Sequence, residues 1–123
     1  MIGRLRLSSI WSEDLNNLLP FYRDTLGLSV GMEAPGFVIL GDPNGPGVAL
    51  GTHSDVHGRA VDPARHMVGF ETDDIQGDCA RLKTAGVKFI EEPNEMGAGW
   101  IATFEDPEGN LVQLLQFNDS GPA

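Results

Sequence analysis

The sequence repeats itself at an interval of about 60 residues, and this repeat limits the possible folds more than any other feature. The segments Asp42-Pro43-Asn44-Gly45 and Asp106-Pro107-Glu108-Gly109 each precede a short apolar stretch. A second pair, Ser12-Glu13-Asp14-Leu15 and Thr72-Asp73-Asp74-Ile75, lies upstream at nearly the same offset. Two pairs of features in the same order indicate two copies of one unit, so both copies are expected to fold alike.

The second copy shows its elements most clearly. An aspartate at 73 or 74 can cap a helix, and Ile75, Cys79 and Leu82 follow at the spacing of one helical face. Gly86 stands where such a helix would end in the left-handed conformation. Strands are predicted over residues 66–72, 87–90, 100–104 and 111–117, with a tight Asp-Pro-Glu-Gly turn before the last of them.

The first copy has the same order of elements, with a strand over about 4–11, a helix over about 14–25 and strands over about 28–33, 37–41 and 47–53. Pro20 is expected to bend or restart the helix. The predicted fold class is therefore α+β: two tandem βαβββ repeats, each a curved mixed sheet with a helix on its outer face, forming a cupped pocket. We expect a single domain over 1–123, with repeat 1 at about 4–53, a linker at about 54–65 and repeat 2 at about 66–117.

Composition narrows the class of partner. The chain has 8 Lys+Arg against 18 Asp+Glu, and a net charge of −10 argues against nucleic-acid binding. One cysteine, Cys79, excludes an intrachain disulfide and a Cys-rich zinc site. No apolar run approaches the roughly 20 residues of a membrane helix, and no signal-peptide core follows the N-terminus. These features predict an acidic cytoplasmic domain that acts without nucleic acid or membrane and handles a small molecule or another protein.

Several segments resemble the vicinal oxygen chelate superfamily, which includes glyoxalase I, bleomycin-resistance proteins and extradiol dioxygenases. The resemblance rests on Asp14-Leu15, the segment Phe21-Tyr22-Arg23-Asp24-Thr25-Leu26-Gly27-Leu28, and Asp106-Pro107-Glu108-Gly109-Asn110. Asp74-Ile75 and Leu82-Lys83-Thr84-Ala85-Gly86-Val87 fit the matching second-half segment. It covers essentially the whole chain and implies the fold rather than the reaction, because this scaffold serves many chemistries.

The resemblance also implies where a divalent metal would be held. One ligand, usually His, lies seven residues before the Asp that opens each helix, and another, usually Glu, lies seven residues after the Asp of the Asp-Pro turn. The corresponding residues of this chain are Leu7, Met67, Ala49 and Gln113. Because these side chains suit a divalent cation badly, we expect the metal-ligand positions to be lost and no cofactor to be bound.

A bound divalent metal remains an alternative if the seven-residue count to the metal-ligand positions is shifted. His66 is one residue from an expected position, although a one-residue slip turns a strand side chain to the other face. His53 and His57 have the spacing of one helical turn, but they lie in or beside the predicted linker with no acidic third ligand.

Strand alternation gives a list of candidate ligand-binding residues. The residues that share parity with the positions named above on their own strands are Leu7, Ser9, Trp11, Ala49, Met67 and Gln113. The turn aspartate of the family, used as the anchor for two further strands, adds Phe37, Ile39, Ile101 and Thr103. The opposite parity is strongly apolar and is predicted to form the core against the helices, with Ile10, Val38, Leu40, Val48, Leu50, Val68, Phe70, Val112 and Leu114. A mostly apolar surface with a few polar groups is typical of a small-molecule site.

Each candidate has a structural alternative. Trp11 and Phe37 could stack on a planar ligand, or fill the cup or a dimer interface. Glu71 and His53 are weak candidates for a general base, with Ser9 or Gln113 positioning a carbonyl oxygen.

Other reactive side chains are assigned structural roles. Cys79 lies on the apolar stripe of its helix and is predicted to be core. The pairs Glu13-Asp14, Asp73-Asp74 and Glu91-Glu92 are expected at helix starts and strand ends, not as a catalytic pair.

Three functions follow from these observations. The first is a metal-independent homodimeric binding protein of the glyoxalase/bleomycin-resistance type that sequesters an apolar or aromatic small molecule, with acidity favouring a cationic one. The second is a lyase, isomerase or dioxygenase-like enzyme that uses polar groups of the pocket or a misaligned metal site. The third is an accessory module that binds another protein.

Overall fold

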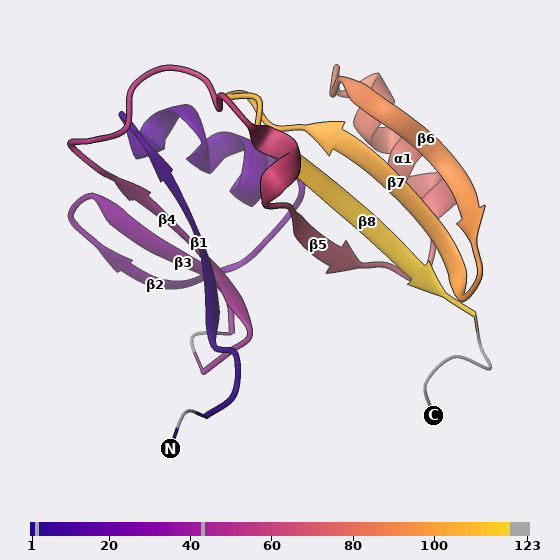
Figure 1. Ribbon diagram of the computed structural model, residues 1–123, viewed down its shortest axis with the longest axis horizontal. Helices are drawn as coiled ribbons and strands as arrows, with labels where there is room; N and C mark the ends of the chain where they lie inside the picture. Colours follow the sequence, from indigo (N-terminus) through magenta and orange to yellow (C-terminus); the bar gives the residue numbers. More distant parts are fainter. Residues whose placement is uncertain (2, 43, 119–123) are drawn as a thin grey trace. The chain divides into compact units, whose positions relative to one another are not determined.

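The computed structural model describes residues 1, 3–42 and 44–118, so Pro43 of the first predicted Asp-Pro turn lies outside the described residues. The chain divides into two compact units, one ending at Gly58 and the other beginning at Arg59, and this boundary falls inside the predicted linker. Each unit contains one four-stranded sheet and its own helical segment (Figure 1).

The sheet of the first unit contains β1 (Leu7–Ser12), β2 (Val30–Ala34), β3 (Phe37–Gly41) and β4 (Gly47–Thr52) in the order β1-β4-β3-β2. β1 pairs in parallel with β4, and the other neighbours are antiparallel, so the sheet is mixed as predicted. Its core contains the predicted helix-facing residues Ile10, Val38, Leu40, Val48 and Leu50, each at most 9% exposed.

The helix predicted over 14–25 is not continuous, because the segment forms two short helices, η1 (Leu15–Asn17) and η2 (Phe21–Thr25). Asp14 caps the first by accepting a hydrogen bond from the Asn16 backbone N–H at 3.0 Å. Pro20 stands at the start of the second, as the predicted restart requires, since proline has no N–H to continue the first. The second is a π-helix whose Phe21 and Tyr22 are buried.

The second unit contains η3 (Pro63–Arg65), β5 (Val68–Glu71), α1 (Ile75–Thr84), β6 (Phe89–Met96), β7 (Gly99–Glu105) and β8 (Leu111–Phe117). Its sheet has the order β5-β8-β7-β6, again with one parallel pair, β5 and β8. Asp74 is the residue that caps α1, and its carboxylate accepts a hydrogen bond from the Gly77 N–H at 3.1 Å. The helix ends before Gly86, whose φ of +89° matches the predicted left-handed end.

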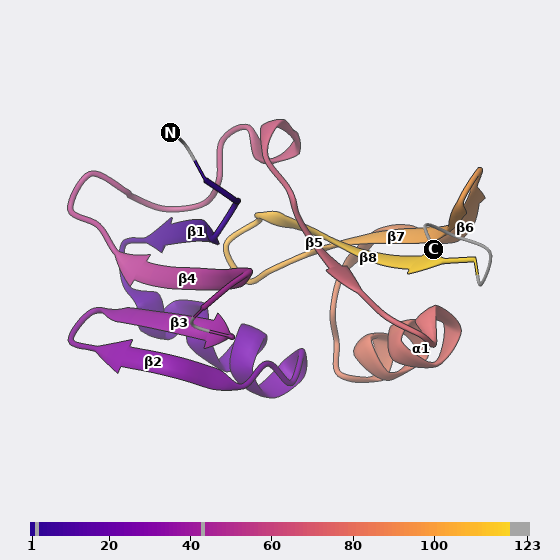
Figure 2. The same cartoon turned by 90° about the horizontal axis from the view of Figure 1, so that it is seen from below.

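α1 lies on one side of its sheet and contacts β6, β7 and β8 (Figure 2). Ile75, Cys79 and Leu82 of the helix are buried, as are Phe104 and Val112 of the sheet. No helix in the described part of the chain is long and apolar enough to cross a membrane, and α1 has only 10 residues.

β6 differs most from the prediction, which ended this strand at Ile90. The strand continues to Met96, through two irregularities of register around Ile90 and between Glu91 and Asn94. Because β6 is an edge strand, Pro93 and the extra residues interrupt no ladder on its outer side. The irregularities change which side chains share a face with β7.

Candidate functional site

The first sheet presents one face to its own helices, and we call the opposite side its helix-free face. Trp11, Gly51 and Phe37 are register partners across β1, β4 and β3, and Ser9, Ala49 and Ile39 form the next row. Since partners in a row point to the same side, the register brings six candidate residues onto the helix-free face: Leu7, Ser9, Trp11, Phe37, Ile39 and Ala49. Contact of these residues with a ligand stays a prediction.

Three rings gather on this face, and we call Trp11, Phe37 and His53 the aromatic cluster. The ring centroids of Trp11 and Phe37 lie 6.2 Å apart with planes inclined at 29°. His53 meets the indole edge to face at 5.7 Å. Trp11 is 42% exposed, which is high for a side chain as large and apolar as tryptophan. The cluster is therefore a preformed aromatic surface available to a planar molecule.

His53 is fixed by two backbone contacts. Its own N–H donates to the Ser12 carbonyl oxygen at 2.9 Å, and its Nδ1 accepts from the Asp55 N–H at 3.1 Å. A neutral imidazole that accepts at Nδ1 carries its proton on Nε2, so it presents a donor to a ligand. This geometry favours recognition of an acceptor over the role of general base predicted for His53.

The second sheet also has a helix-free face, opposite α1. Gln113 stands between Gly69 and Thr103 in one row, and Glu71, Leu115 and Ile101 form the next. The candidates Ile101, Thr103 and Gln113 thus share one face with Glu71, while Met67 lies directly before β5 and is half-buried. Within the described residues, the Glu71 side chain makes no hydrogen bond or ion pair, and its catalytic role stays a prediction.

The positions that the family resemblance assigns to a metal do not fit one. Leu7 and Ala49 have no donor atom, Met67 offers only a thioether, and Gln113 offers only an amide. Among the described residues, no three His, Cys, Asp or Glu side chains come together as metal ligands. His66, the alternative of a shifted count, and His57, which was weighed together with His53, are both exposed.

Cys79 is a buried side chain of the α1–sheet interface. Burial raises the pKa of the thiol to about 11, with the nearby Asp78 carboxylate adding to the rise. The thiolate, which is the nucleophilic form, is therefore scarce at neutral pH. This agrees with a packing role.

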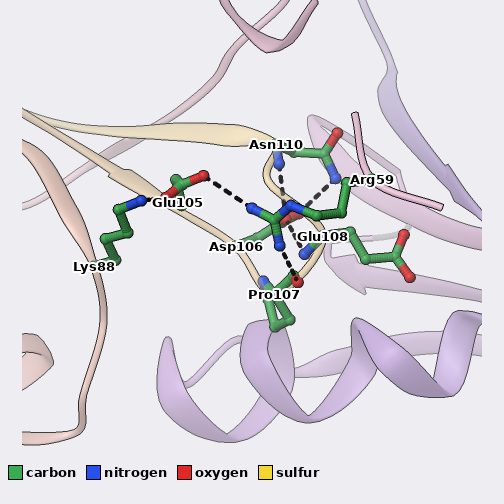
Figure 3. A network of polar contacts seen from close by, with 7 residues as sticks. All are labelled: Arg59, Lys88, Glu105, Asp106, Pro107, Glu108 and Asn110. Atoms are coloured by element: carbon green, nitrogen blue, oxygen red, sulfur yellow. Dashed lines mark hydrogen bonds and ion pairs between the residues drawn. The ribbon is translucent and has the colours of Figure 1, made fainter. Parts of the chain in front are cut away.

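A polar network at the start of the second unit was missed by sequence reasoning (Figure 3). Arg59 donates to the Glu105 carboxylate at 3.1 Å and to the Pro107 carbonyl oxygen at 3.3 Å. Lys88 pairs with the other oxygen of Glu105 at 3.0 Å. Arg59 lies in the predicted linker, and its local sequence gives no indication of a partner 46 residues away.

The Asp-Pro turn next to this network is organised by Asp106, which is 4% exposed. Its carboxylate accepts hydrogen bonds from the Glu108 N–H at 2.8 Å, the Asn110 N–H at 2.9 Å and the Asn110 side-chain amide at 2.8 Å. The repeated aspartate is thus a structural residue of the turn and not a free acid.

Glu91 is a further residue that sequence reasoning missed. The Glu91-Glu92 pair was expected at a strand end, but both residues lie inside β6. Glu91 is the register partner of Thr103 and accepts a hydrogen bond from the Asn94 side-chain amide at 3.0 Å. The sequence of this part of β6, which includes Pro93, has no pattern that predicts a strand.

Comparison with known proteins identifies the family. The model of the glyoxalase/bleomycin resistance protein/dioxygenase superfamily matches residues 3–114. The chain belongs to this superfamily. Among its relatives, a protein of Shewanella frigidimarina is 35% identical over 97 residues, which cover 70% of this chain and 68% of that protein.

Solved structures of the superfamily share the fold. TnmS3, an antibiotic-binding protein from a Streptomyces species, is 28% identical with a TM-score of 0.73, over 95% of this chain and 98% of that chain. The trypanothione-dependent glyoxalase I of Leishmania major is 25% identical with a TM-score of 0.72, over 94% and 87%. A binding protein and an enzyme are thus about equally similar in structure, so function must be argued from side chains.

Proposed function

We propose that this superfamily member is a metal-independent binding protein that sequesters an apolar or aromatic small molecule. The observation that carries the proposal is the aromatic cluster on the helix-free face of the first sheet. Trp11 and Phe37 supply a broad apolar surface at small cost in side-chain entropy, and the Nε2–H of His53 supplies a directed donor. A planar ring bearing a carbonyl or other acceptor oxygen matches this combination.

Two further observations support the proposal. The family's metal positions hold Leu7, Ala49, Met67 and Gln113, which are poor ligands for the cations that the enzymes of such a scaffold would use. TnmS3, which is an antibiotic-binding protein, is similar over nearly the full length of both chains. From composition we also infer a cytoplasmic protein that has neither nucleic acid nor membrane as a partner, and from the resemblance to bleomycin-resistance proteins we infer a homodimer.

The binding proposal is tested by fluorescence. The chain has two tryptophans, so a Trp100→Phe background leaves Trp11 as the single reporter. Titration with a panel of planar aromatic compounds is expected to quench Trp11 saturably, and Phe37→Leu should weaken the binding. If no compound quenches Trp11 and its replacement by Phe changes no calorimetric signal, the proposal fails.

Metal independence has its own test. The purified protein should contain no stoichiometric divalent metal, and EDTA or added Mn²⁺, Zn²⁺ or Ni²⁺ should leave its melting temperature unchanged. A cation that bound only the folded state would raise that temperature by mass action. Stoichiometric metal together with a large EDTA-induced decrease would overturn the metal-free part of the proposal.

An enzymatic function is the second candidate, and Glu71 is the residue that favours it. Its carboxylate is exposed on the face that carries Gln113 and Thr103, and within the described residues it has no cation partner. A free carboxylate of this kind could act as a general base on a bound carbonyl compound. Glu71→Gln should then abolish turnover of a bound compound while preserving the affinity for that compound. If the Glu71→Gln variant still turns the compound over, this role is excluded.

A further inference from the structure

The connection between β3 and β4 contains the single Asn-Gly dipeptide of the chain. Asn44 is one of six asparagines, and the other five are followed by Asn, Leu, Glu, Leu and Asp. An asparagine can cyclise when the backbone nitrogen of the next residue attacks its side-chain carbonyl carbon. A glycine at that next position hinders the attack least, because it has no β-carbon. Asn44 is therefore the asparagine that its neighbour protects least.

The turn itself requires the glycine. Gly45 has a φ of +86°, and an ideal β-carbon there would lie 2.9 Å from the Arg6 carbonyl oxygen. Any other residue would be strained in this conformation and would collide with the backbone before β1. The reactive dipeptide is thus part of the geometry that joins β3 to β4.

The Asn44 side chain can move toward this nitrogen. Asn44 is exposed, and among the described residues its side-chain amide makes no hydrogen bond. The Asn94 side-chain amide, by contrast, donates to three oxygens, and that of Asn110 donates to the Asp106 carboxylate. Those two amides are held by their contacts, whereas that of Asn44 can rotate.

Arg4 contacts the peptide group that would react. Its Nη2 donates a hydrogen bond to the Asn44 carbonyl oxygen at 2.5 Å. This oxygen belongs to the same peptide group as the Gly45 nitrogen, which must lose its proton before it attacks. The negative charge of the deprotonated peptide group is shared with that oxygen, so a guanidinium bound there stabilises the charge.

One contact opposes the reaction. The Gly45 N–H donates to the Asp42 carbonyl oxygen at 2.8 Å, so the nitrogen is accessible to base only when this turn opens. Asp42 and Asn44 are both exposed. Exposed turns open locally at a much smaller free-energy cost than global unfolding. We therefore expect a slow reaction in the folded chain.

We propose that Asn44 is a site of spontaneous deamidation and that Arg4 promotes the reaction. Hydroxide removes the Gly45 N–H proton, and the nitrogen then bonds to the side-chain carbonyl carbon of Asn44. The bond from that carbon to the amide nitrogen breaks, and this nitrogen leaves as ammonia with a proton from water. Water then opens the resulting succinimide at either carbonyl carbon, which leaves aspartate or isoaspartate at position 44.

The two products differ in their effect on the sheet. Both place a carboxylate near the Arg4 guanidinium. Isoaspartate also adds one methylene to the backbone between the register partners Gly41 and Gly47. Since β4 pairs with both β3 and β1, isoaspartate in this connection should destabilise the first sheet.

The test follows the modification of the full chain by mass spectrometry. The purified protein is incubated at mildly alkaline pH and digested at intervals. We expect the peptide with Asn44 to gain the mass difference between amide and acid, and to separate into two products, before any other asparagine reacts. Asn17, which is also exposed but is followed by Leu18, is the internal control. If Asn17 or another asparagine reacts first, the site is overturned.

Variants of Arg4 test how the reaction is promoted. Arg4→Gln removes the charge but keeps a donor, and should slow the deamidation of Asn44 about threefold, the size of effect of an exposed charged contact. Arg4→Lys keeps the charge and should react nearly as fast as the unchanged protein. Arg65→Gln removes the same charge from the exposed pair with Asp62 and should leave the rate unchanged. A rate in Arg4→Gln that is equal or higher would overturn the role of Arg4.

The melting temperature tests the effect on the sheet. It should fall in the incubated protein as isoaspartate accumulates. Asn44→Gln should keep its melting temperature during the same incubation, because glutamine cyclises through a larger ring and much more slowly. Freshly purified Asn44→Asp, which has the carboxylate without the added methylene, should melt like the fresh unchanged protein. If the incubated protein contains isoaspartate and still melts like the fresh protein, the destabilising effect is overturned.

Discussion

The indole ring of Trp11 occupies the space that a β-carbon on Gly51 would fill: an ideal β-carbon there would lie 2.7 Å from Cε3 of the ring. Two residues on neighbouring strands therefore depend on each other, because only glycine lets the ring lie over β4. The backbone of Gly51 does not require glycine for its own conformation, since its φ lies outside the left-handed region.

Gly51→Ala should accordingly displace the Trp11 ring without unfolding the protein. The ring is 42% exposed and can swing outward, so we expect the free energy of unfolding to change by less than about 1 kcal/mol. The Trp11 emission maximum should move, and aromatic ligands should bind more weakly. Gly97→Ala is the control, because a β-carbon there meets nothing within 4 Å. Unchanged ligand affinity in Gly51→Ala would show that the ring does not contact the ligand.

The two repeated turn aspartates should differ in their contribution to stability. Asp106 is buried and its carboxylate accepts three hydrogen bonds, so Asp106→Ala should lower the free energy of unfolding by about 2–4 kcal/mol. Asp42 is exposed, and among the described residues its carboxylate accepts one hydrogen bond, from the Asn44 N–H at 2.9 Å. Asp42→Ala should therefore cost about 1 kcal/mol or less. Urea denaturation of the two variants measures the difference, and equal losses would contradict this account of the turn.

Arg59 should stabilise the second unit although it lies in the predicted linker. Its partner Glu105 is only 14% exposed, so Arg59→Ala is expected to cost about 1 kcal/mol, the upper end for such pairs. Arg65→Ala removes the same charge from the exposed pair with Asp62 and should cost almost nothing. The urea midpoints of the two variants, with and without added salt, provide the measurement. A loss of stability no larger than that of Arg65→Ala would mean that the network has no net effect.

Cys79 should be protected from reagents and should make stability depend on alkaline pH. The folded state holds the thiol pKa at about 11, above its ordinary value of 9.0, so the folded state retains the proton more strongly. The resulting stabilisation is complete below pH about 9 and is lost as pH rises through about 11. At pH 8 the native protein should react with a disulfide reagent only as fast as it unfolds. Cys79→Ala should remove the part of the alkaline loss due to this thiol; an identical pH profile would contradict the assignment.

Local patterns were sufficient for most of the fold, and they failed where one residue changes the backbone path. The repeat and the alternation predicted seven of the eight strands within a few residues, and Asp74 and Gly86 mark the ends of α1. The helix over 14–25 was predicted by analogy with the second copy, with a bend or restart at Pro20. In the structure, Pro20 divides it into a short 3-10 helix and a π-helix. The prediction ended β6 at Ile90 because the following Glu91-Glu92-Pro93-Asn94 is typical of a loop.

The candidate site was predictable only on regular strands. Alternation placed Trp11, Phe37 and Ile39 on one face once the family's metal position and turn aspartate had fixed its phase, since β1 and β3 keep an unbroken period of two. It failed for Glu91, because the irregularities of β6 reset that period. Arg59 was out of reach for another reason: its contact with Glu105 depends on where the chain returns in space, which no local pattern encodes.

The parallel pairing of β1 with β4 has a consequence for synthesis. Leu7 leaves the ribosome long before Gly47, its register partner, so the first strand of each unit must wait for the last. Closing this pair late makes folding slower than in a protein built from adjacent hairpins. A nascent chain halted between β3 and β4 would therefore leave β1 unpaired, with its apolar residues Leu7, Ile10 and Trp11 available for chaperone binding.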